Sequence, residues 1–94
     1  MSYCTVSHWN ATEWNGQLET TAREKFVPLI MPIGATKVQM IRTSDLSFCV
    51  VTEYADAAAA ETAQARIAEI RSQAADELPM SMASSHAGEV FANG

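Results

Sequence analysis

The chain of 94 residues has few of the residues that mark unusual chain geometry or strong electrostatic binding. It contains four glycines, three prolines and two cysteines, and only 18% of its residues are charged. No apolar run approaches the roughly 18 residues that a membrane span needs. The glycines are isolated, so no glycine-rich phosphate loop is present, and no G-x-S-x-G nucleophile motif occurs. These absences argue against a transmembrane helix, a phosphate-binding loop and a hydrolase nucleophile elbow.

Positive charge is sparse and dispersed along the chain. The net charge is −5 and the isoelectric point is about 4.8. The six cations are Arg23, Lys25, Lys37, Arg42, Arg66 and Arg71. Nucleic acids and anionic membrane surfaces are bound through clustered Lys and Arg side chains. We therefore expect no nucleic-acid partner and no membrane partner.

The first residues of the chain lack the basic and then apolar layout of a signal peptide. Without an export signal, Cys4 and Cys49 are expected to be free thiols in a reducing compartment. The sequence therefore predicts a cytoplasmic protein. Because 94 residues suit one small core, it also predicts one domain over residues 1–94.

Apolar periodicity divides the first half of the chain into a strand and a helix. Residues 3–9 are rich in β-branched and aromatic side chains and predict a strand. Residues 12–30 predict a helix whose apolar face consists of Trp14, Leu18, Ala22, Phe26 and Leu29. Asn10 and Glu13 have the spacing of a capping box at its start. Pro28 is expected to kink or end the helix, because its ring blocks a backbone hydrogen bond.

The second half begins with two strands, predicted at residues 36–43 and 46–54, which a short turn joins into an antiparallel hairpin. Residues 55–78 predict a long helix, capped by Asp56 and ended by Pro79. Its apolar stripe is Ala60, Ala63, Ile67, Ile70, Ala74 and Leu78. Its charged flank, which includes Arg71, is expected to face solvent. Residues 80–85 predict the last strand, with a turn at 86–88 and an extension at 90–91.

The order β-α-β-β-α-β predicts an α+β, ferredoxin-like fold, a four-stranded antiparallel sheet with both helices on one face. A hairpin turn centred on Ser44 and Asp45 would pair Ile41 with Phe48 and Met40 with Cys49. The open face would then carry an apolar cluster of Ile41, Phe48, Val50 and Tyr54. Such a cluster indicates an interaction surface or the floor of a ligand site. A shift of one residue would exchange the two faces.

In length and element order the whole chain resembles the dimeric α/β-barrel superfamily, which includes antibiotic-biosynthesis-monooxygenase-like and stress-responsive barrel proteins. The resemblance is carried by the strand at 3–9, the segment 26–35 and the hairpin that follows. It implies a homodimer that packs sheet to sheet around a small cavity, and oxygenation without a cofactor. A polar residue near the end of the first strand can help hold substrate in such relatives, which His8 or Asn10 would match. In the haem-degrading branch an Asn there acts with a Trp and a His from the second half, and the helix at 55–78 has neither.

Candidate ligand-binding residues follow from the predicted open face and the resemblance. They are His8, Asn10, Gln39, Ile41, Phe48 and Tyr54. For Asn10 the alternative is a helix cap, and for His8 a hydrogen-bonded strand histidine. Catalytic residues are not identified. No metal is expected, because Cys4 and His8 would lie about 13 Å apart at roughly 3.3 Å per residue of strand. The resemblance implies that no cofactor is needed.

Two functional hypotheses remain from the sequence. In the first, a homodimer with an apolar cavity between its sheets binds or oxidises a hydrophobic small molecule, and desolvation and orientation assist the substrate's own reactivity. In the second, the protein is a non-catalytic small-molecule carrier or a structural dimerisation module. The lack of a convergent ionisable cluster favours the second, so the sequence leaves open whether the protein is an enzyme.

Overall fold

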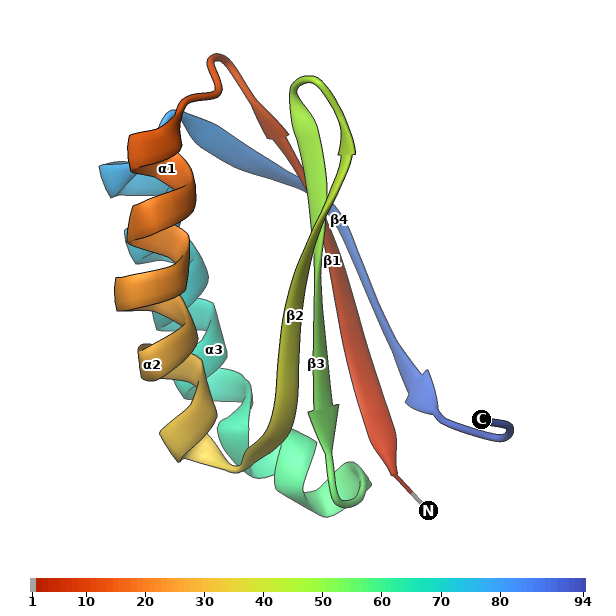
Figure 1. Cartoon of the computed structure of the whole chain (residues 1–94). Coiled ribbons are helices and arrows are strands. Elements are labelled where there is room, and N and C mark those ends of the chain that lie inside the picture. Colours follow the sequence, from red (N-terminus) through yellow and green to blue (C-terminus); the bar gives the residue numbers. More distant parts are fainter. Residues whose placement is uncertain (1) are drawn as a thin grey trace.

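The fold is a four-stranded antiparallel sheet covered by helices on one face (Figure 1). A computed structural model describes residues 2–94. The strands are β1 (Tyr3–Ala11), β2 (Ala35–Ser44), β3 (Ser47–Tyr54) and β4 (Met80–Glu89), in the spatial order β2-β3-β1-β4. The helical segments are α1 (Gly16–Thr21), the π-helical turn η1 (Ala22–Phe26), α2 (Val27–Ile30), the 3₁₀ turn η2 (Met31–Ile33) and α3 (Ala57–Glu77). This arrangement confirms the predicted ferredoxin-like fold.

The first helical segment starts later than the sequence predicted. Its N-cap is Asn15, whose Oδ1 accepts a hydrogen bond of 2.9 Å from the backbone N–H of Leu18. Asn10 is not a cap, because β1 continues through Ala11 and includes it. The capping box with Glu13 was therefore wrong. The β-pairing of Asn10 with both neighbouring strands keeps it extended and delays the start of the helix.

Pro28 changes the helix without ending it. The backbone N–H of Val27 donates to the carbonyl oxygen of Ala22, five residues earlier, which makes the preceding turn π-helical. A wider turn here accommodates a proline, which has no N–H and whose ring crowds the carbonyl four residues before it. The helical course then runs through Ile30 and a 3₁₀ turn to Gly34. Gly34 has a φ of 114°, a left-handed conformation that glycine adopts without strain.

Helix α3 matches its prediction closely. Asp56 caps it by accepting a 2.8 Å hydrogen bond from the backbone N–H of Ala59. Four members of the predicted stripe are buried, namely Ala60, Ala63, Ile70 and Ala74. The helix ends at Glu77, shortly before Pro79. Small alanine side chains on the buried face allow the helix to lie close to the sheet.

The register of the β2–β3 hairpin differs by one residue from the prediction. The turn residues are Asp45 and Leu46, and Thr43 is an extra residue on β2, so Ile41 pairs with Cys49 rather than with Phe48. A one-residue shift moves every side chain of a strand to the opposite face. As a result the even-numbered residues of β3 face the helices. They are Phe48, Val50, Thr52 and Tyr54.

Strand β4 is longer than predicted and contains no turn at residues 86–88, which pair with β1. Ala83 is an extra residue opposite the junction of His8 and Trp9, where the register of the pair shifts. Such a bulge bends the strand and increases its twist. The proposed extension at residues 90–91 is not part of the strand, and Phe91 is 91% exposed.

The hydrophobic core fills the layer between the sheet and the helices. Trp9 from β1 and Phe48 from β3 stack there with ring centroids 6.1 Å apart, and both are buried. The helices contribute Leu18 from α1, Phe26 from η1 and Ile30 from α2. The opposite face of the sheet carries no helix (Figure 1).

Candidate functional site

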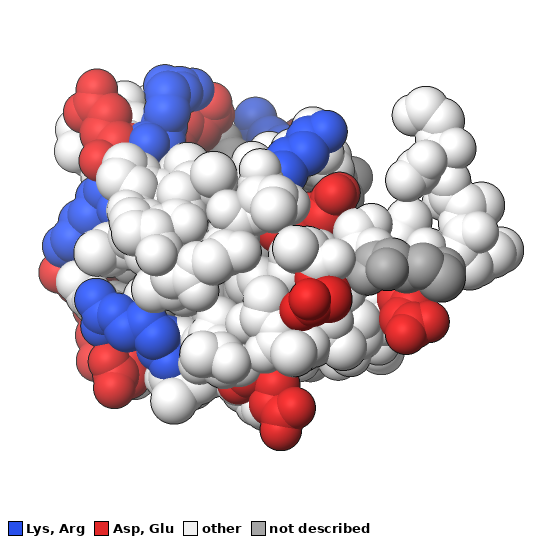
Figure 2. Space-filling model, turned by 90° about the horizontal axis from the view of Figure 1, so that it is seen from below, with Lys and Arg blue, Asp and Glu red and all other residues white. Residues whose placement is uncertain are grey.

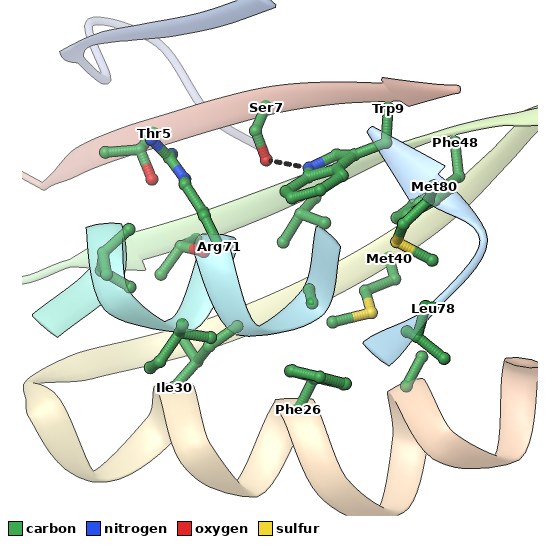
Figure 3. A pocket seen from close by; sticks show the side chains of 16 residues that line it. Thr5, Ser7, Trp9, Phe26, Ile30, Met40, Phe48, Arg71, Leu78 and Met80 are labelled. Carbon is green, nitrogen blue, oxygen red and sulfur yellow. Dashed lines mark hydrogen bonds between the residues drawn. The ribbon is translucent and has the colours of Figure 1, made fainter. Parts of the chain in front are cut away.

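A small cavity of about 50 Å³ lies inside this core, between the sheet and the helices (Figure 3). Trp9 and Phe48 form its wall on the sheet side, and Phe26, Ile30 and Ile70 form its wall on the helix side. The remaining apolar lining residues are Ala22, Met40, Val50, Ile67, Ala74, Leu78 and Met80. The flexible thioethers of Met40 and Met80 can adjust to the shape of a ligand.

Hydroxyl groups from the sheet give the cavity its few polar atoms. Ser7 and Thr52 are each 3% exposed, and Thr5 lies further along β1. The indole Nε1 of Trp9 donates a 2.8 Å hydrogen bond to Oγ of Ser7 (Figure 3). This bond satisfies the one polar group of the indole and fixes the ring against the cavity.

Arg71 is the charged residue of the cavity lining. It extends from α3 toward Thr5 on β1 (Figure 3) and is partly buried. Burial lowers the pKa of its guanidinium, and the neighbouring Tyr54 phenol opposes that shift. Burial likewise raises the pKa of Tyr54, and the charge of Arg71 works against the rise. Within residues 2–94 the two ion pairs are Lys25–Glu77 and Arg66–Glu69, so Arg71 has no carboxylate partner.

A surface groove of about 520 Å³ adjoins the cavity at this end. It runs between α3 and the strands β1 and β4, with Tyr54 and His86 in its lining. Thr5, Ile67 and Arg71 line both the groove and the cavity. The three shared residues therefore mark the place where the cavity opens toward the surface.

A second surface hollow, of about 270 Å³, adjoins the opposite end of the cavity. Trp14 lies there, with its ring edge against Phe48 and its Nε1 donating a 2.7 Å hydrogen bond to Glu19. Arg42 stacks on the Trp14 ring at 4.5 Å and donates to the backbone carbonyls of Ser44 and Asp45. The guanidinium of Arg42 is thus already engaged, whereas that of Arg71 has no such partner among the described residues.

The six predicted ligand-binding residues fall into two groups on opposite faces of the sheet. His8, Asn10, Gln39 and Ile41 lie on the open face and are exposed. Phe48 and Tyr54 face the helices and are buried, because of the hairpin register. Of the six, Phe48 lines the cavity and Tyr54 lines the adjoining groove. A cavity between two sheets would require a second subunit and stays a prediction.

The soft metal ligands of the chain are spread over the sheet. The rings of His8 and His86 approach edge to face, with centroids 6.3 Å apart. Cys4 lies further along β1, and burial followed by the charge of Glu53 raises the pKa of its thiol. A raised thiol pKa disfavours the thiolate that binds metals or attacks substrates. In the described part of the chain, no three His, Cys, Asp or Glu side chains are grouped to hold a metal ion.

Sequence reasoning missed Arg71, Ser7 and Thr52 as members of the site. Arg71 was assigned to the solvent-facing flank of its helix. The signal that could have placed it was its spacing, since it follows Ile67 by four residues and therefore shares a face with the apolar stripe. Ser7 precedes Trp9 by two residues on β1, and side chains two residues apart on a strand point to the same face. A correct hairpin register would have moved Thr52 to the same side.

Comparisons with known proteins establish the fold of this chain. SnoaB, a cofactor-independent oxygenase from Streptomyces nogalater, superposes with a TM-score of 0.69 and 13% identity over 98% of this chain and 95% of SnoaB. A dimeric ferredoxin-like protein from an uncultured marine organism gives a TM-score of 0.68 and 12% identity, over 100% of this chain and 98% of that one. Rv0793 from Mycobacterium tuberculosis gives a TM-score of 0.64 and 9% identity, over 99% of this chain and 98% of that one. No protein-family model and no curated protein matches the sequence. The likeness confirms the ferredoxin-like fold that the sequence predicted.

Figure 2 shows one end of the molecule, where basic and acidic side chains are mixed around a broad central area without charged residues. Within residues 2–94, no helix is both long enough and apolar enough to cross a membrane.

Proposed function

We propose that this protein binds a hydrophobic small molecule in the cavity between its sheet and its helices. The supporting observation is the composition of the cavity wall, in which apolar side chains form most of the lining and three hydroxyls and a single cation supply the polar groups. Ligand sites of soluble proteins typically combine an apolar wall with a few polar groups that set orientation. The cavity volume of about 50 Å³ is small for such a site, and the adjoining groove supplies the further room that a ligand needs.

We further propose that two copies pair through their open sheet faces. Val6, Ile41, Cys49 and Val51 lie on that face, and Ile41 is 45% exposed. Apolar side chains gathered on an uncovered sheet favour association. The marine structural neighbour is a dimeric protein, which is consistent with this pairing. Pairing there would leave the cavity of each subunit intact, because the cavity lies on the other face.

The activity that we propose for this site is oxygenation without a cofactor, as in the structural neighbour SnoaB. A balanced form of the reaction converts an activated CH₂ group and O₂ into a ketone and water. Two C–H bonds and the O–O bond break, one oxygen atom enters the product, and the other leaves as water with both hydrogens. The cavity would supply orientation and exclude bulk water, and the substrate would supply its own reducing electrons.

The alternative is a non-catalytic carrier, and one observation favours it. Among the described residues that line the cavity there is no carboxylate, histidine or cysteine, so no side chain there is suited to act as a general base near neutral pH. A carrier needs only the apolar wall and the orienting polar groups. Oxygen consumption by the protein together with its own released ligand separates the two functions, because a carrier consumes none.

Native mass spectrometry of the purified protein tests the binding proposal, from gentle to denaturing conditions. We expect a dimer that carries an apolar adduct and releases it on denaturation. Ala74→Leu places a larger side chain in the cavity wall and should abolish the adduct, whereas Ala75→Leu, on the exposed side of the same helix, should retain it. Circular dichroism checks that both variants are folded. A monomer would contradict the pairing, and a bare dimer would favour a structural module.

A further inference from the structure

An arginine lies at each end of the cavity, and the two differ in whether other groups of the protein already bind their guanidinium. At one end Arg42 stacks on Trp14 and donates to backbone carbonyls 3.2 and 2.8 Å away. At the other end Arg71 reaches the boundary between cavity and groove, and no ion pair or side-chain hydrogen bond engages it within residues 2–94. A guanidinium is a planar donor suited to bidentate contact with an anionic oxygen group. The end of the Arg71 side chain lies beside Thr5, at the boundary of the cavity and the groove (Figure 3).

The charged guanidinium of Arg71 is partly buried, and removing a charge from water is unfavourable. The side chain is partly buried against apolar neighbours, including Ile67, and burial lowers the pKa of its guanidinium. A structural role would be served by a neutral side chain of similar length, because the stem alone covers apolar surface. Glu61, the carboxylate that lines the same groove, lies ten residues before Arg71 on α3 and forms no ion pair with it among the described residues.

We infer that Arg71 is the head-group subsite for a hydrophobic ligand that carries one anionic oxygen group, such as a carboxylate, phenolate or enolate. This inference rests on the proposed function and names the class of molecule that the cavity takes. One end of the apolar body would enter the cavity toward Ile70, and the rest would lie in the groove beside Ile67. The acidic oxygen would lie toward Arg71 and the hydroxyl of Thr5. Because the cavity wall has a cation and no carboxylate, histidine or cysteine, it suits a ligand that is acidic enough to ionise by itself.

A pair of isosteric probes tests the subsite. The probes are 2-naphthoate, which is anionic, and 2-naphthamide, which has nearly the same shape without the charge. Calorimetric titration of the full chain should show that naphthoate binds at least about tenfold more tightly than naphthamide. Arg71→Met keeps an apolar stem and removes the charge, so the two probes should bind it about equally. Arg66→Met removes an exposed arginine on the same helix and should leave the preference unchanged.

Naphthamide serves as the internal check on the cavity itself. Its affinity for Arg71→Met should match its affinity for the unmodified protein, which shows that the cavity has survived the substitution, and Arg71→Gln provides a second neutral variant. Equal binding of both probes by the unmodified protein would overturn the head-group subsite and leave the binding cavity standing. Failure of both probes to bind would overturn the proposed function as well. A preference for naphthoate that persists in both neutral variants would assign the anion contact to another residue.

Discussion

The two faces of the sheet are built from alternate residues of the same strands, yet they have different properties. On β1, Ser7 and Trp9 face the helices and are nearly inaccessible, whereas His8 between them is exposed on the open face. The covered face carries a cavity with a cation at its edge. The open face carries Val6, Ile41, Cys49 and Val51 beside polar side chains such as His8. A single register choice in the hairpin therefore decides which residues can form a binding site and which can form a subunit contact.

The largest expected difference between the two faces concerns stability. Ile70, which is 3% exposed, packs on the covered face, and Ile70→Ala should lower the free energy of unfolding by about 2–5 kcal/mol through lost burial and a residual cavity. The same substitution at Ile41, which is 45% exposed, should change it by less than about 1 kcal/mol in the monomer. Chemical denaturation monitored by circular dichroism measures both values. Comparable losses in a dilute monomer would contradict the assignment of the faces.

Protein concentration sharpens this comparison. If the open faces pair in solution, Ile41→Ala should weaken the dimer, and its effect on the unfolding midpoint should grow as the concentration rises. Ile70→Ala should destabilise the protein by a similar amount at all concentrations, because it acts within one subunit. A penalty at Ile41 that does not depend on concentration would speak against pairing through this face.

Much of the fold could be predicted because its signals are local. The stripe of α3, its Asp56 cap and the stop at Pro79 depend on residues close together in the sequence, and the structure has all three. The start of the first helical segment failed because Asn10 and Asn15 are both good caps. The choice between them depends on how far β1 pairs with its neighbours, which is a tertiary property.

The site was harder to predict than the fold. The hairpin register depended on whether Thr43 is paired or bulged, and turn residues alone do not settle that point. The error moved Phe48 and Tyr54 to the open face, whereas the structure places them on the face that the helices cover. Arg71 was missed because a charged residue beside an apolar stripe normally lies in solvent. It lies four residues after Ile67 and therefore on the same side of α3, and both residues line the cavity.

An intermediate effect is expected from the polar groups of the covered face. Ser7→Ala leaves the indole N–H of Trp9 without the acceptor that now lies 2.8 Å away, and should cost about 1–3 kcal/mol of unfolding free energy. In the background of Trp9→Phe the same substitution should cost much less, because no donor remains to be satisfied. Ser84→Ala, at an exposed position on β4, is the matched control and should change stability by less than about 0.5 kcal/mol. Equal costs of Ser7→Ala in both backgrounds would show that this hydrogen bond does not hold the ring.

The smallest effect on stability is expected from an exposed ion pair between the helices. Lys25 donates to both carboxylate oxygens of Glu77 at 2.7 Å and so joins η1 to the end of α3. This hydrogen bond holds the pKa of Glu77 below its ordinary value of 4.5. Because that pKa is lowered on folding, the contribution is present above pH 4.5 and is lost as the pH falls through the lower folded value.

Lys25→Met should therefore lower the melting temperature slightly at about pH 7 and have almost no effect at about pH 2. The decrease should be smaller than that caused by Ser7→Ala, since exposed ion pairs contribute little. Arg66→Met is the matched control, because it removes an ion pair with Glu69 that stays within one helix. Thermal denaturation at the two pH values provides the measurement. An unchanged deficit for Lys25→Met in acid would mean that the aliphatic stem of Lys25, rather than its charge, joins the two helices.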